Sequence, residues 1–147
     1  MIESFERPDP PMVMREMLEG LVPDQQMGTD YVDVYGRFYE QNKDEYAPIK
    51  MEDLDFILLR RKGGYLTPEF TDVIGLEVHT MARTRDRSLR LMHEVGRRIL
   101  ESEGKEYGGF LIDFGMTLNG PEEDNIDSMD DRIMIESFEL HIRVNWT

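Results

Sequence analysis

Several residue types and patterns are missing from this chain of 147 residues, and each absence excludes a class of protein. It has no cysteine, which excludes a disulfide scaffold, a thiol nucleophile and a cysteine-ligated zinc site. The longest apolar runs are short, such as residues 56–59, and none is long enough to span a bilayer. The first residues lack the basic and apolar regions of a signal peptide, so we expect a protein of the cytosol.

Basic side chains are scarce as well. The chain has 17 basic and 31 acidic side chains, a net charge of −14, which disfavours a nucleic-acid binder or a surface for anionic lipid. The excess is uneven, because residues 51–100 hold 9 basic and 8 acidic side chains whereas both flanks are strongly acidic. We therefore expect attraction between the middle of the chain and its flanks, within one copy or between copies.

The remaining composition is that of one folded domain covering residues 1–147, since 39% of the residues are hydrophobic and 10% are aromatic. Asp9 followed by two prolines predicts the start of a helix over residues 10–21. Thr84 predicts the cap of a longer helix over residues 84–102. Alternating apolar residues predict four strands, at residues 56–61, 72–79, from 110 onward, and 134–146.

This order predicts a two-layer α+β domain, in which an antiparallel or mixed sheet of 4–5 strands carries both helices on one face. We expect residues 31–55 to form a variable strand or loop insertion and residues 119–131 to form an acidic loop. The hexapeptide Met-Ile-Glu-Ser-Phe-Glu occurs at residues 1–6 and again at 134–139. It is too short for a duplicated unit, but the first copy can add to a sheet edge as a strand.

No motif supports catalysis or a bound cofactor. The three histidines, His79, His93 and His141, lie on different predicted elements, and Arg97 stands where a zincin helix needs its second histidine. The acidic loop offers no register with the glycine that an EF-hand requires. We therefore expect no catalytic residue, no metal and no cofactor, and a protein that is not an enzyme.

A charge pattern is the clearest candidate for a site. Four arginines fall on one stripe of the predicted long helix, nearly opposite its apolar face: Arg83, Arg87, Arg90 and Arg97. A solvated helix back is the simple explanation, and the net charge disfavours nucleic acid as the partner. The alternative is a subunit interface in which these arginines face the acidic residues of a neighbouring copy: Glu122, Glu123, Asp124, Asp127, Asp130 and Asp131.

Residues 60–64, Arg-Arg-Lys-Gly-Gly, lie between a predicted buried strand and a second strand that begins at Asp72 and continues Leu-Glu-Val at residues 76–78. A Thr-x-Ala break at residues 80–82 and an arginine-rich helix follow. With the N-terminal helix and the two final strands, this order resembles the tail terminator (tail completion) proteins of long-tailed double-stranded DNA bacteriophages. The resemblance covers most of the chain and is weakest across residues 24–53, which are longer and richer in tyrosine than the family pattern.

The resemblance implies a structural virion protein that is assembled in the host cytoplasm and located at the head-proximal end of the tail. Copies of the chain would form a hexameric ring that stops polymerisation of the major tail tube protein and joins the tail to a neck (head-completion) protein. DNA would pass through the lumen without specific binding, and no membrane is involved. Two other functions stay open, a neck or head-completion ring of the same virion and a small cytosolic acidic protein-binding module.

Overall fold

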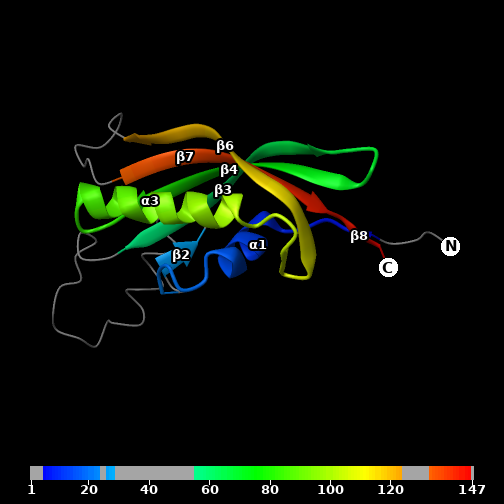
Figure 1. Ribbon diagram of the computed structural model, residues 1–147, viewed down its shortest axis with the longest axis horizontal. Coiled ribbons are helices and arrows are strands. Elements are labelled where there is room, and N and C mark those ends of the chain that lie inside the picture. Colours follow the sequence, from blue (N-terminus) through cyan, green and yellow to red (C-terminus); the bar gives the residue numbers. More distant parts are fainter. Residues whose placement is uncertain (1–4, 24–25, 29–54, 124–132, 147) are drawn as a thin grey trace.

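The computed structural model describes residues 5–23, 26–28, 55–123 and 133–146, and these form an α+β fold built on a curled sheet (Figure 1). In chain order the elements are β1 (Phe5–Glu6), α1 (Pro10–Met17), β2 (Met27–Gly28), β3 (Phe56–Leu66), β4 (Thr71–Met81), α3 (Arg85–Leu100), β5 (Glu106–Tyr107), β6 (Phe110–Glu123), β7 (Ile133–Arg143) and β8 (Asn145–Trp146).

The main sheet has six strands in the order β2-β3-β4-β7-β6-β5, and it is mixed because β2 runs parallel to β3 while the other pairs are antiparallel. The expectation of 4–5 strands was wrong. The outer strands β2 and β5 have two residues each, too few to produce an alternating pattern in the sequence. A separate two-stranded sheet pairs β1 with β8, so the first copy of the repeated hexapeptide does end in a strand.

The long helix α3 packs on the sheet against β4, β6 and β7. Its start is as predicted, since Thr84 caps it by accepting a hydrogen bond from the backbone N–H of Arg87. Its buried residues are Ser88, Leu91, Met92, Val95, Gly96 and Ile99. Ser88 also fixes the first turn to β4, because its hydroxyl and carbonyl exchange hydrogen bonds with Thr80 in a fully buried position.

The helix layout differs from the expectation. α1 ends at Met17 instead of residue 21, and Gly20 follows with φ +86, a left-handed conformation that no helix continues. Apolar Leu18 and Leu21 fitted the helical spacing, but they pack against the core from the turn that follows the helix. The two helices also lie over different strands, since α1 contacts β3 and β5.

β3 continues through the two glycines that were expected to end it. Its register with β4 shifts between Arg61 and Gly64, a bulge in which Gly64 adopts φ +126. A Cβ on Gly64 would lie 2.1 Å from the carbonyl oxygen of Val73, so the two strands approach more closely here than any side chain permits. The glycine pair therefore makes a bulge inside a long hairpin, and the hairpin turn itself lies between residues 66 and 71.

The acidic loop cannot begin at residue 119 as predicted, because residues 119–123 belong to β6. Residues 124–131 of that loop and residues 31–54 of the expected insertion lie outside the described residues. β7 follows the predicted alternation, with Met134, Phe138, Leu140 and Ile142 buried in the core. Glu136, the exception in this row, is buried with them at 7% exposure.

The end of α3 crosses β6 at Gly115. A Cβ on Gly115 would lie 2.7 Å from both the carbonyl oxygen and a methyl carbon of Ile99, so the crossing depends on a residue without a side chain. Gly120, five positions further along β6, has nothing within 4 Å of its Cβ position.

We expect Gly115→Ala to lower the free energy of unfolding by about 1–3 kcal/mol, because helix and strand must move apart to admit the methyl group. Gly120→Ala is the matched control and should change it by less than about 0.5 kcal/mol. Urea denaturation of both variants measures the difference. Equal stability of the two would show that α3 does not cross β6 this closely.

Candidate subunit interface and charged clusters

All four predicted interface arginines are exposed to solvent, on or directly before α3 and away from the sheet. Three of them already have acidic partners in their own chain. Arg87 binds Asp55 at 2.7 Å, Arg90 binds Asp86 one turn earlier, and Arg97 lies between two glutamates. Hydrogen bonds to these acids raise the pKa of Arg87 and Arg97 above the ordinary arginine value. The back of α3 is therefore a mixed-charge surface rather than a purely basic stripe.

These ion pairs are exposed, so each contributes little to stability and is readily exchanged for another partner. Arg83, ahead of the helix, forms no ion pair with any residue in the described part of the chain. Of the acidic residues predicted to face the arginines, Glu122 and Glu123 lie at the end of β6. The other four, Asp124, Asp127, Asp130 and Asp131, lie outside the described residues.

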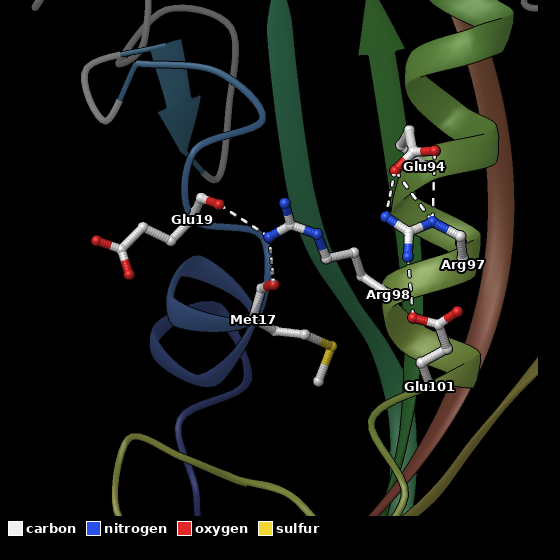
Figure 2. A network of polar contacts seen from close by, with 6 residues as sticks. All are labelled: Met17, Glu19, Glu94, Arg97, Arg98 and Glu101. Carbon is white, nitrogen blue, oxygen red and sulfur yellow. Dashed lines mark hydrogen bonds and ion pairs between the residues drawn. The ribbon is translucent and has the colours of Figure 1, made fainter.

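Arg97 and its neighbour Arg98 have different roles (Figure 2). Arg97 binds Glu94 at 2.7 Å and Glu101 at 3.0 Å, both on its own helix. Arg98 points away from α3 toward α1, where its guanidinium donates to the carbonyl oxygens of Met17 at 3.2 Å and Glu19 at 2.8 Å. Arg98 therefore caps the end of α1 from outside and satisfies carbonyls that the helix itself leaves unpaired.

A second arginine contact that the sequence did not reveal joins the segment before α1 to the main sheet. Asp72, at the start of β4, is completely buried, and Arg7 donates two hydrogen bonds to its carboxylate, at 2.8 and 3.3 Å. Arg61 of β3 lies 3.6 Å from the same carboxylate. Hydrogen bonding to Asp72 raises the pKa of Arg7. A buried charge needs such partners, and 65 residues separate Arg7 from Asp72 in the chain.

The sheet face opposite α3 carries two His–Glu pairs. His79 lies 2.5 Å from Glu77, and His141 lies 2.9 Å from Glu139 and stacks on Phe114 with ring centroids 3.9 Å apart. Burial favours a higher pKa for Glu77, but hydrogen bonds from His79 and Lys62 outweigh it and lower the value. Across the described ranges, no group of three or more His, Asp or Glu side chains is placed to hold a metal ion.

Glu136 is the most perturbed carboxyl group described. It lies on β7 beneath α3, where its Oε2 is 3.6 Å from the position a Cβ on Gly96 would take. Burial raises its pKa from an ordinary 4.5 to about 7. A carboxyl group of this kind is a candidate acid or base at an active site, but the helix and sheet cover Glu136 and leave it no access to a substrate.

One surface hollow of the described part of the chain lies between α1 and the turn that joins β5 to β6. It has a volume of about 400 Å³ and is lined by Arg7, Asp9, Met12, Val13, Gly108 and Phe110. A smaller hollow on the other side of Met12 adds Arg15, Glu16 and Glu19. These linings mix opposite charges and bring no nucleophile next to a base, so they do not make a catalytic site.

No protein-family model matches the chain, and no curated protein matches it at a significant level of similarity. In the part of the chain that the structure describes, no helix is both long and apolar enough to cross a membrane.

We expect Arg98→Met to destabilise the fold by about 1–3 kcal/mol, since it leaves two carbonyls at the end of α1 without their charged donor. Arg97→Met is the matched control, because it removes only exposed ion pairs and should cost less than about 0.5 kcal/mol. Thermal and urea unfolding of both variants measure this. A similar loss in the two variants would contradict the role of Arg98 as a tie between the helices.

We also expect Glu136 to make stability depend on pH. Because its folded pKa is raised, the folded state holds the proton more tightly than the unfolded chain, so stability is highest below pH 4.5 and falls as pH rises toward about 7. The whole loss is on the order of 3 kcal/mol.

Glu136→Gln keeps the shape of the side chain without the charge and should remove this part of the pH dependence, which makes the variant more stable than the parent above pH 7. Glu103→Gln, at an exposed position, should leave the dependence unchanged. Urea titrations at about pH 5 and about pH 8 compare the three proteins. The same pH dependence in the parent and Glu136→Gln would show that Glu136 is not buried as a neutral acid.

Proposed function

We propose that this chain is a structural virion protein of a long-tailed bacteriophage, a tail terminator that forms a ring on the head-proximal end of the tail tube. In this role it stops polymerisation of the tube and presents a surface to the neck. The protein needs no catalytic residue and no cofactor, because its activity is the shape and the binding surfaces of the ring.

The observation that carries the proposal is the order in which the elements assemble into one sheet. A helix precedes a hairpin that contains the Arg-x-Gly-Gly bulge, and a long helix and two further strands follow. The hairpin and the last two strands form the four central strands, with α3 against three of them. The order of helix, hairpin, long helix and two strands is the order on which the resemblance to tail terminators rests, although the two glycines lie within β3 and not at its end.

The charge of the chain suits a ring around DNA. A net charge of −14 repels the phosphates of a duplex that must move through the lumen without binding to the wall. Within the ring, the proposed subunit contact is head-to-tail, so that one type of interface repeats and closes by rotation. Arg83, Arg87, Arg90 and Arg97 on one copy then face the acidic segment that begins with Glu122 on the next copy.

Electron microscopy of lysates in which this reading frame is interrupted tests the proposal. A terminator that is missing leaves overlong tail tubes without heads, because nothing stops the addition of tube subunits. Restoring the intact chain from a second gene copy should restore tails of normal length.

Other outcomes identify the two alternatives. Tails of normal length that are separated from filled heads would assign the chain to the neck instead. Normal infectious particles would exclude a virion role and leave the small acidic binding module, which should then bind a cationic peptide with strong salt dependence.

A further inference from the structure

Within the described residues, the two long edges of the main sheet are open over matching stretches. β2 pairs with β3 only at Ile57 and Leu58, and β5 pairs with β6 only at Leu111 and Phe110. At Ile112 the backbone N–H and C=O of β6 still bond to Lys105 and Gly104. Among the described residues, none pairs with the outer side of β3 beyond residue 58 or of β6 beyond residue 112. Such edges present unpaired backbone N–H and C=O groups and are ready templates for another strand.

The register of the sheet places these two stretches in the same rows of paired residues, counted across the strands. One row across the four central strands contains Tyr65, Val73, His141 and Phe114. A second row contains Arg60, Glu77, Ser137 and Asn119. The open part of β3, from residue 60 to residue 65, thus lies level with the open part of β6, from residue 119 back to residue 114. The short strands β2 and β5 lie beyond opposite ends of this interval.

The two edges are also chemically complementary. β6 exposes three apolar side chains in succession, Phe114 at 39%, Met116 at 40% and Leu118 at 49%, and it ends in Glu122 and Glu123. β3 exposes Tyr65 at 61% in the row of Phe114, and it carries basic residues at positions 60–62. Arg60 is exposed and forms no ion pair with any described residue. An aromatic residue thus lies level with an apolar edge, and a cation lies near the acidic end.

Strand direction allows the two edges to pair. β3 is antiparallel to β4, β4 to β7 and β7 to β6, so β3 and β6 run in opposite directions. A second copy placed beside the first, with its sheet continuing in the same sense, therefore puts its β3 antiparallel to β6. Position 122 lies in the row of Ile135, His79 and Leu58, so in that register Arg60 of the second copy occupies the position diagonal to residue 122.

From this geometry we propose that β6 of one copy binds β3 of a second copy edge to edge, so that the main sheet continues from subunit to subunit. The pairing is head-to-tail, so a row of copies has an open β3 edge at one end and an open β6 edge at the other. The row closes into a ring when these two end edges pair. It adds a second contact to the head-to-tail ring proposed above, beside the one between the α3 arginines and the acidic segment, and rests on that proposal only for the closed ring. The association between copies follows from the sheet alone.

The test uses the purified full chain in sedimentation velocity over a concentration series, at low and high salt. The parent should self-associate, and Arg60→Glu or Glu122→Arg alone should weaken association at least roughly tenfold, because each places like charges together across the interface. Glu103→Lys is the matched control, an exposed charge reversal in the turn after α3 and outside both open stretches, and it should associate like the parent. Circular dichroism establishes that each variant is folded.

Mixing the two single variants gives the decisive result. In the mixture, every contact between unlike variants again joins opposite charges, so association should return to within roughly threefold of the parent. The double variant should associate for the same reason. If copies associated only through a contact between α3 and the acidic segment, mixing the two variants would not restore association.

Three results would overturn the edge pairing: a parent that stays monomeric at every concentration, an Arg60→Glu variant that associates like the parent, or a mixture that stays apart. None of them bears on the tail phenotype in lysates. Conversely, normal tails in the interrupted lysate would refute the terminator role and leave the sedimentation result intact.

Discussion

The fold depends on how closely α3 lies on the sheet. Its first turn is held by the buried exchange of hydrogen bonds between Ser88 and Thr80, and its last turn crosses β6 over Gly115. Between these points Gly96 has no side chain, so the helix backbone lies directly above Phe138 and Glu136. α1 is attached in turn to α3 through Arg98, so an error in the position of α3 would propagate to the second helix.

Two arginines connect segments that are distant from each other in the chain. Arg98 ties two helices and Arg7 ties the N-terminal segment to β4, whereas Arg97 holds only residues of its own helix. The planar guanidinium suits this use, because it donates several hydrogen bonds in fixed directions and stays charged. The chain has more acidic than basic residues, and Arg60 and Arg83, which form no ion pair with any described residue, are available to a neighbouring copy without the loss of a described contact.

Local signals in the sequence predicted the central elements well, because caps and alternation act over a few residues. The Thr84 cap and the buried row of β7 are examples. The short strands β2 and β5 and the bulge at Gly64 could not be predicted, since they depend on pairing with residues far along the chain. For the candidate interface, helical spacing predicted the exposed arginines of α3 but neither their ion pairs to Asp55 and Glu101 nor the open strand edges. A one-dimensional pattern contains no information about which acid or which edge lies nearby.

The pairing of β1 with β8 determines how early in synthesis this small sheet can form. Phe5 and Glu6 pair with Trp146 and Asn145, so this small sheet has no partner strand until the ribosome has released almost the whole described chain. At about 5–20 residues per second, the first strand waits for several seconds. Arg7 follows directly, and the Asp72 that it neutralises is made long before β8. The hairpin can therefore fold around its buried carboxylate early, whereas the small sheet of β1 and β8 can close only after β8 has been made.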